Sequence, residues 1–342
     1  MIRVGINGFG RIGRMVLRIA LQSKNIQIVH INDINTSVPN LAYLLKYDSI
    51  YGVLNSSVDT KNKEIIIDGE FINVSHNSDI TKVDWRKSMV DVVVESSGVV
   101  SNHNTANGLI NLGVKKVVIT HSSEVVDKTI VYGVNEASYD HKNDNVLSSS
   151  ICDTNAVAPL LKLVNDNFTI MSGNVTTLHP WLGYQNLSDG PCRSFAYPGE
   201  LYENFSLGRA STESMLPKTT SCVSAAMHVV PELEGKLISM SFRTPTPIVS
   251  SAILTLQLNK KITKESFGLL LSEKISLQKK KIFSMNEEPL ISKDFLRNDY
   301  SVIIDHRWTE VDISNNIRFV LWYDNEWGYS SRVVDLVRMI GL

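Results

Sequence analysis

Apolar and polar positions follow two different patterns along this chain, and the change comes at about residue 150. Before it, short runs rich in valine and isoleucine alternate with segments of helical spacing, which is typical of βαβ units around a parallel sheet. The expected strands cover residues 2–7, 26–32, 90–96, 116–120 and 145–149. Helices are expected over 11–23 and 39–46, and from about 104 to 113. The pair Asp68 and Gly69, between two apolar runs, adds a small antiparallel hairpin.

The second half has longer apolar runs and few helical segments. A helix over 153–165 precedes strands at 170–179, 236–243, 248–258 and 317–323, a pattern typical of an α+β domain with a mostly antiparallel sheet. We therefore expect an α/β domain over 1–151 and an α+β domain over 152–327.

Two further segments complete this organisation. An amphipathic helix over 328–342 is expected to pack back on the first domain. The irregular stretch 183–218 is expected near the cleft or a subunit interface, because long loops in compact domains are usually functional.

Composition narrows the class of partner. The chain has 34 basic and 35 acidic side chains and a formal net charge of -1, which gives no electrostatic basis for binding nucleic acid or an anionic membrane. No stretch approaches the ~18 apolar residues that a membrane span needs, so we expect a cytoplasmic protein that acts on a small molecule. The three cysteines form no Cys-x-x-Cys pair, so neither a disulfide framework nor a metal site is predicted.

A glycine-rich turn points to a nucleotide cofactor. Gly8, Gly10 and Gly13 follow the first strand and open the first helix, where backbone amides and the helix N-terminus bind a pyrophosphate. Asp33 ends the second strand, where a carboxylate accepts the hydroxyls of an adenosine ribose and repels a 2′-phosphate. Together these features predict a Rossmann-type domain with NAD as cofactor. The alternative is a tight turn without a ligand, with Asp33 as a solvated strand end.

Cys152 is the candidate for covalent chemistry. It lies where a strand ends and a helix begins, so the unpaired amides of the helix N-terminus favour its thiolate. His179 closes a later strand and is placed to share a proton with this thiol across the cleft. The spacing alone proves nothing, because most cysteines are buried apolar residues and most histidines are structural. Cys192 and Cys222 have weaker contexts, and we interpret both as structural.

Several motifs resemble the glyceraldehyde-3-phosphate dehydrogenase family, and the similarity spans essentially the whole chain. The most specific are GINGFGRIGR at 5–14 and WYDNEWGY at 322–329. The others are IND at 31–33, KYDS at 46–49, VVES at 93–96 and VVPELEGK at 229–236. The resemblance implies a Rossmann-type NAD-binding domain, an α+β catalytic domain and a homotetramer.

The resemblance also implies roles for the two reactive residues. ICDTN at 151–155 occupies the place of the family's Ser-Cys-Thr-Thr-Asn, so Cys152 corresponds to the nucleophile. TTLH at 176–179 matches the strand that ends in the family's catalytic histidine, which is His179 here. The implied reaction is thiolate attack on a small, phosphorylated aldehyde, hydride transfer to NAD, and release of the thioester to inorganic phosphate. Its reference substrate is D-glyceraldehyde 3-phosphate, and its product is 1,3-bisphosphoglycerate.

Further residues match the family's cofactor contacts. Arg11 and Ile12 match residues that touch the pyrophosphate, and Asn325 matches the asparagine that holds the nicotinamide amide. Ser97 and Thr120 are also expected in the cofactor site.

The sequence departs from the family where anions are bound. Ile151 and Asp153 stand in place of a serine and a threonine, and Leu182 and Tyr184 in place of two threonines after the histidine. A carboxylate a few ångströms from a phosphate dianion costs on the order of 1–4 kcal/mol near a surface. Asp153 has two interpretations. It complements the helix dipole as a first-turn residue, or its charge opposes thiolate formation at Cys152.

Other anion-binding positions are kept. Thr220 and Arg243 retain the family's residue types, and with Asp153 they are the expected substrate-binding positions. The preceding loop is longer than the family pattern, so either Arg193 or Arg209 could supply the second phosphate-binding arginine.

Three functions stay open from the sequence. The first is the ordinary phosphorylating dehydrogenase with unusual anion sites. The second is a paralogue that takes a different aldehyde or releases its thioester to water. The third is a non-catalytic nucleotide-binding protein, against which the retained Cys152, His179 and Asn325 argue.

Overall fold

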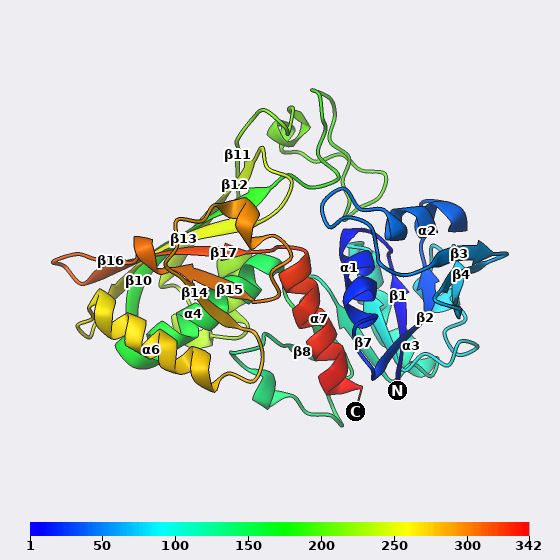
Figure 1. The fold of residues 1–342 in the computed structure, drawn as a ribbon, viewed down its shortest axis with the longest axis horizontal. Helices are drawn as coiled ribbons and strands as arrows, with labels where there is room; N and C mark the ends of the chain where they lie inside the picture. Colours follow the sequence, from blue (N-terminus) through cyan, green and yellow to red (C-terminus); the bar gives the residue numbers. More distant parts are fainter. Residues whose placement is uncertain (342) are drawn as a thin grey trace.

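The structure of the protein is a computed structural model that describes residues 1–341, so position 342 of the predicted terminal helix lies outside it. Two lobes, each built on its own sheet, lie on either side of helix α7 (Trp327–Ile340) (Figure 1). The first sheet has nine strands in the order β3-β4-β5-β2-β1-β6-β7-β9-β8. Its strands are β1 (Ile2–Asn7), β2 (Ile26–Asn32), β3 (Val58–Lys61), β4 (Glu64–Ile67), β5 (Glu70–Ser75), β6 (Val92–Glu95), β7 (Lys116–Ile119), β8 (Lys128–Thr129) and β9 (Val146–Ser148).

The centre of this sheet is parallel, as predicted. Strands β2, β1, β6, β7 and β9 pair in parallel, and every residue of β6 and β7 is buried. Burial on both faces explains why these strands are continuous apolar runs in the sequence. The helices of this lobe are α1 (Arg11–Ala20), α2 (Val38–Lys46) and α3 (Val100–Asn111). Helix α3 begins before the predicted start near Asn104, because its first turn buries the polar residues Asn102 and His103, which an apolar pattern does not count.

The predicted hairpin is present between β4 and β5, which pair antiparallel. Asp68 and Gly69 have φ angles of 50° and 87°. Both turn residues are therefore left-handed, as a two-residue hairpin with a type I′ turn requires. Strand β3 adds a third strand to the hairpin at the sheet edge.

The second lobe contains an eight-stranded sheet in the order β11-β12-β10-β13-β17-β15-β14, with β16 paired to β17. Its pairs are antiparallel except for β10 with β12 and β14 with β15, which confirms the predicted mostly antiparallel sheet. Its strands are β10 (Ile170–Pro180), β11 (Leu216–Lys218), β12 (Leu237–Thr244), β13 (Ser250–Leu258), β14 (Phe283–Asn286), β15 (Val302–Asp305), β16 (Glu310–Val311) and β17 (Asn316–Tyr323). Its helices are α4 (Cys152–Phe168), α5 (Cys222–Met227) and α6 (Lys264–Leu277).

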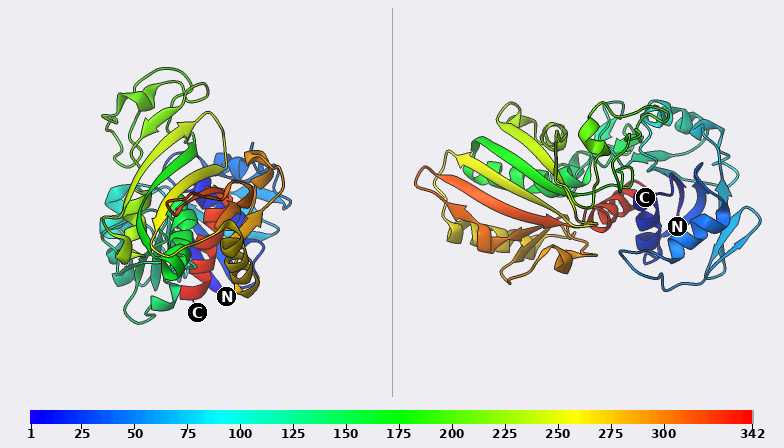
Figure 2. Two further views of the ribbon diagram at one scale, coloured as in Figure 1. Left: turned by 90° about the vertical axis from the view of Figure 1, so that its left-hand side faces the viewer. Right: turned by 90° about the horizontal axis from the view of Figure 1, so that it is seen from above.

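Helix α7 returns from the second sheet and lies between the lobes, where it contacts α1, β7 and α4 (Figure 2). Its apolar and polar residues fall on different faces, as predicted, but the polar face is not exposed to solvent, because every residue from Trp327 to Val337 is buried. Its polar residues are paired inside the protein, as in the ion pair of 2.8 Å between Arg332 and Asp335. Among residues 1–341, no helix has both the length and the apolar character needed to cross a membrane.

The stretch 183–218 is irregular apart from β11, a short 3-10 turn at Phe205–Gly208 and an isolated antiparallel bridge between Arg193 and Leu201. It projects above both lobes in Figure 1. The backbone amide of Val100, at the start of α3, donates a hydrogen bond of 3.1 Å to the carbonyl of Ala196. This loop of the second lobe therefore contacts the first lobe.

Candidate active site

Cys152 is the first residue of α4, at the junction of the two lobes. Two residues before it, Ser150 has a left-handed φ of 57° and turns the chain from β9 into the helix. Among residues 1–341 no side chain caps the helix N-terminus, so its free amides lie beside Cys152, which is half-buried.

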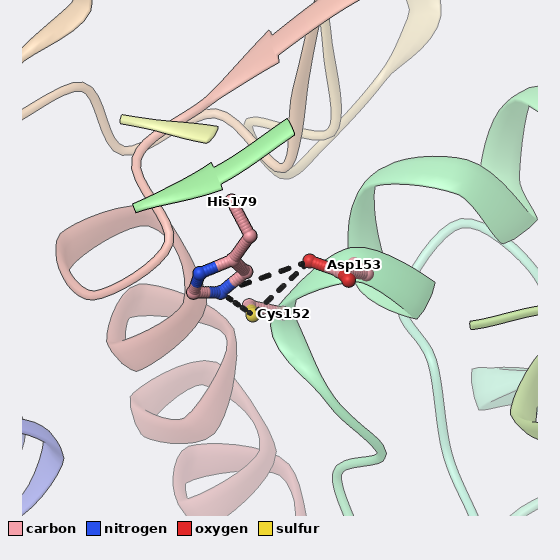
Figure 3. Close-up of side chains that lie close together, drawn as sticks. All are labelled: Cys152, Asp153 and His179. Carbon is pink, nitrogen blue, oxygen red and sulfur yellow. Dashed lines mark hydrogen bonds and ion pairs between the residues drawn. The ribbon is translucent and has the colours of Figure 1, made fainter. Parts of the chain in front are cut away.

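His179 lies on β10, with its ring toward Cys152 (Figure 3). Its Nε2 is 3.6 Å from Sγ of Cys152, and its Nδ1 is 2.8 Å from the carbonyl oxygen of Pro180. A carbonyl only accepts, so Nδ1 carries the proton and Nε2 is free to accept one from the thiol. Burial, followed by the charge of Arg243, lowers the pKa of His179 to about 4, so the imidazole is neutral at physiological pH. The pairing predicted from the sequence is present.

The structure changes the expectation for the thiol itself. Burial, followed by the negative charge of Asp153, raises the pKa of Cys152 well above its usual value, while Arg243 acts in the opposite direction. The field of the helix N-terminus alone therefore does not keep the thiol ionised. At neutral pH the resting pair is a neutral thiol beside a neutral imidazole, whose Nε2 is placed to accept the thiol proton.

Asp153 lies in the first turn of α4, as its first interpretation requires, and is also part of this cluster. Its carboxylate is buried, and its Oδ1 lies 3.5 Å from Sγ of Cys152 and 4.0 Å from Nε2 of His179 (Figure 3). The hydroxyl of Tyr323 on β17 donates a hydrogen bond of 2.8 Å to the same oxygen. The position near the thiol agrees with the second interpretation of this residue, in which its charge opposes thiolate formation.

Two cationic side chains share the face of the sheet that bears His179. In the strand register, Arg243 on β12 is opposite both His179 and Leu216, and Lys218 on β11 is opposite Ser241. Cross-strand partners project to the same face, and so do residues two apart on one strand. Both cations contribute to lowering the pKa of His179, which places them near the imidazole.

The guanidinium of Arg243 is buried but only partly bonded. Its Nη2 is 3.5 Å from the hydroxyl of Tyr184, and its Nε has no hydrogen-bond partner within residues 1–341. Burial, followed by the charge of Arg243, lowers the pKa of Lys218. Two cations held close together at the site favour a bound anion. Sequence reasoning missed Lys218, although the signal was a lysine two residues before Thr220.

The other residues expected to bind an anion, Thr220, Arg209 and Arg193, give less support for an anion site. Thr220 is half-buried, and its Oγ1 accepts the backbone amide of Cys222 at 3.1 Å, at the start of α5. Arg209 is exposed and forms an ion pair of 2.7 Å with Asp189. Arg193 is exposed as well.

The glycine-rich turn has the geometry of a pyrophosphate site. A Cβ on Gly8, whose φ is 86°, would lie 2.4 Å from the backbone of Ser97, and one on Gly13 would lie 2.2 Å from the carbonyl oxygen of Gly8. A Cβ on Gly10 would meet no atom within 4 Å, so this backbone faces open space at the N-terminus of α1. The first turn of α1 contains no acidic residue. An anion is therefore favoured at this helix end.

Asp33 and Asn325 have oxygens available for a dinucleotide. Oδ2 of Asp33 accepts the amide of Phe9 at 2.7 Å and Oδ1 accepts the amide of Asn35 at 2.8 Å, which fixes the carboxylate beside the turn. Each oxygen keeps a lone pair for a ribose hydroxyl. Asn325 is buried, yet its Oδ1 has no partner among the residues that the structure describes. An unpaired buried amide oxygen fits a donor from a carboxamide.

The side chain of Arg11 is engaged in ion pairs within the protein and does not point to a pyrophosphate contact. Its guanidinium pairs with Glu326 at 2.6 Å and with Asp48, and so ties α1 to the segments after α2 and before α7. This engagement leaves the backbone amide of Arg11 for a ligand. Ile12 is half-buried and packs against the core.

Ser97 and Thr120 surround a buried acid that sequence reasoning missed. Glu95 ends β6, accepts the amide of Ser97 at 2.8 Å and is also bonded to the side chains of Ser97 and Asn7. Thr120 donates a hydrogen bond of 3.1 Å from its hydroxyl to the carbonyl of Glu95. Burial raises the pKa of Glu95 to about 7 despite these donors. The signal in the sequence was an acid within an apolar strand.

Comparison with known proteins supplies the identity of this arrangement. Residues 2–103 match the model of the glyceraldehyde 3-phosphate dehydrogenase NAD binding domain, and residues 151–325 match that of the glyceraldehyde 3-phosphate dehydrogenase C-terminal domain. The glyceraldehyde-3-phosphate dehydrogenase of Priestia megaterium is 40% identical over 339 residues, covering 99% of this chain and 98% of the relative. That of Geobacillus stearothermophilus is 39% identical with the same coverage, and a Kluyveromyces lactis relative is 38% identical over 99% of this chain and 100% of its own. The chain belongs to the glyceraldehyde-3-phosphate dehydrogenase family.

Proposed function

We propose that this protein catalyses the NAD-dependent oxidation of D-glyceraldehyde 3-phosphate, with inorganic phosphate as acyl acceptor and 1,3-bisphosphoglycerate as product. The observation that carries this proposal is the Cys152–His179 pair, with Sγ and Nε2 3.6 Å apart beside a dinucleotide cradle. Family membership over nearly the full length of the chain supports it, and neither a non-catalytic protein nor a different reaction is favoured by any relative named above.

His179 is the proposed general base. Its Nε2 takes the proton of Cys152 as the sulfur attacks the aldehyde carbon and gives it to the developing alkoxide, which becomes the hydroxyl of the hemithioacetal. The same Nε2, neutral again, takes that hydroxyl proton back when the hemithioacetal is oxidised. Bound NAD would supply the acceptor for the hydride of the hemithioacetal carbon, and a thioester would remain on Cys152. The base must be neutral for these steps, and its pKa of about 4 keeps it so.

Lys218 and Arg243 are the proposed anion-binding pair. The unpaired Nε of Arg243 and the ammonium of Lys218 supply donors that the apolar Ile151 and Leu182 cannot. Two positive charges also offset the carboxylate of Asp153, which by itself would repel a phosphate. This is why we favour a phosphorylated aldehyde in spite of the altered anion site. Thr220 is a proposed contact of the same site.

The cofactor contacts are proposed from the fit described above. The amides of Gly10, Arg11 and Ile12 would face the pyrophosphate, Asp33 the adenosine ribose, and Asn325 the nicotinamide carboxamide. Ser97 and Thr120 would lie at the carboxyl ends of their strands, on the cofactor side of the sheet.

The domain boundaries, the homotetramer and the cytoplasmic location remain proposals. We propose an NAD-binding domain over 1–151 and a catalytic domain over 152–327, with α7 packing back on the former; the two matched domains support this division. The irregular loop exposes large apolar side chains, as expected for a subunit interface. They are Leu187, Phe195, Tyr197, Leu201, Phe205 and Met215.

Formation of NADH by the purified protein from D-glyceraldehyde 3-phosphate, with and without inorganic phosphate, tests the proposal. Strong phosphate-dependent turnover that Cys152→Ser abolishes is the expected result. Turnover that does not need phosphate would identify a thioester released to water. Stable binding of NAD without any turnover would support the non-catalytic alternative.

A further inference from the structure

Cys152, Asp153 and His179 form a cluster with the chemistry and spacing of a metal site. Their Sγ, Oδ1 and Nε2 atoms all lie within 4.8 Å of one another. Thiolate, carboxylate and imidazole are three of the ligand types that bind zinc, and three protein ligands with an open fourth position is a common zinc arrangement. This differs from the expectation that the chain has no metal site, which rested on cysteine spacing alone.

The distances agree with a common central ion. Tetrahedral coordination at ordinary zinc bond lengths places ligand atoms about 3.3–3.6 Å apart. In the structure Sγ is 3.5 Å from Oδ1 of Asp153 and 3.6 Å from Nε2 of His179, and the separation of Oδ1 and Nε2 is 4.0 Å. Only the last separation must shorten, by a small rotation of the carboxylate.

The surrounding hydrogen bonds hold two of these ligands in place. Nδ1 of His179 donates to the carbonyl of Pro180, which directs the lone pair of Nε2 into the cluster. The hydroxyl of Tyr323 holds the carboxylate of Asp153 at Oδ1. Such outer partners fix the orientation of metal ligands in known sites.

The negative charges of two of the ligands also favour a divalent cation. A thiolate and a carboxylate in contact are unfavourable without a counterion, whereas with a neutral imidazole they balance the two positive charges of a divalent ion. Arg243 and Lys218 face the same space and oppose a cation, while Cys222 on α5 and Tyr329 on α7 are neutral neighbours. The two ligand charges are in direct contact with the ion position, so they outweigh the more distant cations.

We propose that Cys152, Asp153 and His179 bind a thiophilic divalent cation, of which Zn²⁺ is the best match, as an inhibitory site created by the aspartate at position 153. The proton of the Cys152 thiol leaves to solvent as the sulfur–metal bond forms, and nothing is oxidised or reduced. Bound metal occupies both the nucleophile and the base, so turnover stops. The inhibition rests on the proposed function, whereas the binding does not.

Titration of the chelator-treated full-length protein with Co²⁺ tests the binding without any turnover. We expect one ion per chain and a thiolate-to-cobalt charge-transfer band in the near ultraviolet. Competition with a chromogenic chelator then measures Zn²⁺ affinity. Asp153→Thr, which restores the residue type of the family, should lower this affinity at least about tenfold, because one of three ligands is lost. Asp166→Asn removes a carboxylate from the exposed face of the same helix and should leave it unchanged.

The outcomes separate the possible sites. Cys152→Ser should abolish the charge-transfer band. Cobalt bound without that band, for example at the exposed pair of His228 and Glu124, would overturn the proposal. Equal zinc affinity of Asp153→Thr and the unmodified protein would also overturn the proposal.

Asp153→Asn is the control for misfolding, because asparagine has the same shape and can still accept a hydrogen bond from Tyr323. Its near-ultraviolet circular dichroism should match that of the unmodified protein, so that a loss of affinity reflects the missing charge.

Discussion

The hydroxyl of Tyr323 donates a hydrogen bond to Oδ1 of Asp153 at 2.8 Å, and both groups are buried. Burial and the adjacent carboxylate raise the pKa of Tyr323 far above its usual value, so the phenol keeps its proton and remains a donor. The bond joins the last strand of the second sheet to the first turn of α4. It therefore holds a negative charge beside the sulfur of Cys152, the position where the proposed reaction must generate a second one.

Asp153→Asn should make the thiol easier to ionise. The carboxylate contributes to the raised pKa of Cys152, so its removal lowers that pKa, and the pH profile of Cys152 alkylation shifts to lower pH. We expect several-fold faster labelling by iodoacetamide at neutral pH, measured in the presence of a chelator so that metal binding does not interfere. Asp166→Asn on the exposed face of α4 is the matched control. An unchanged profile in Asp153→Asn would show that the carboxylate does not govern the thiol.

Lys218→Met should weaken substrate binding more than it slows the chemical step. The ammonium is proposed to bind a substrate anion, and a hydrogen bond to a charged group is worth ~1.5–3 kcal/mol. We expect the KM for D-glyceraldehyde 3-phosphate or for inorganic phosphate to rise about tenfold or more, with kcat changed little. The substrate whose KM rises identifies the anion that Lys218 contacts. Lys61→Met, at the exposed edge hairpin, should leave both KM values unchanged, and a Lys218→Met enzyme that behaved the same way would remove Lys218 from the anion site.

The pattern of apolar residues predicted most accurately the elements in which almost every residue is buried. Strands β1 and β2 were predicted at their observed bounds because their residues are almost all buried on a parallel sheet. Helix α7 was predicted, but the burial of its polar face was not. Its buried Arg332 and Asp335 satisfy each other, and an apolar pattern cannot distinguish a paired buried charge from a solvated one.

Only those residues of the candidate site that lie within short sequence motifs could be predicted. Cys152 and His179 each lie in a short motif that resembles the family, at the start of α4 and the end of β10, so both could be proposed from the sequence. Lys218 was missed because its position depends on the register of β11 with β12, which sets Leu216 opposite Arg243. The same limit applies to the contact of Asp153 with its tyrosine, which joins residues far apart in the sequence.

Glu95→Gln should flatten the pH dependence of stability. The pKa of Glu95 is raised from 4.5 to about 7, so in this range the folded protein holds a proton that the unfolded chain has lost. Stability therefore falls as pH rises from about pH 4.5 to about pH 7, by on the order of 3 kcal/mol. Glutamine is neutral at every pH, so the Glu95→Gln protein does not lose stability for this reason.

Calorimetry of both proteins between about pH 5 and about pH 8 measures this difference. The variant should gain stability relative to the unmodified protein as pH rises, while the histidines common to both contribute equally. Glu213→Gln, in the exposed loop, is the control for loss of an acid. Parallel curves for Glu95→Gln and the unmodified protein would mean that Glu95 ionises normally.

Gly10→Ala and Gly13→Ala should separate cofactor binding from folding within one turn. The φ of Gly10 is -73°, which alanine adopts freely, and its Cβ would point into open space. We expect an unchanged Tm and an NAD affinity lowered about tenfold or more, because the added methyl group occupies the space in which the pyrophosphate must approach the backbone. In Gly13→Ala the methyl group would lie 2.2 Å from the carbonyl oxygen of Gly8 and force the turn apart, at a cost of ~1–3 kcal/mol in the free energy of unfolding. Fluorescence titration with NAD and thermal unfolding measure the two effects, and Gly10→Ala protein that binds NAD like the unmodified chain would place the pyrophosphate elsewhere.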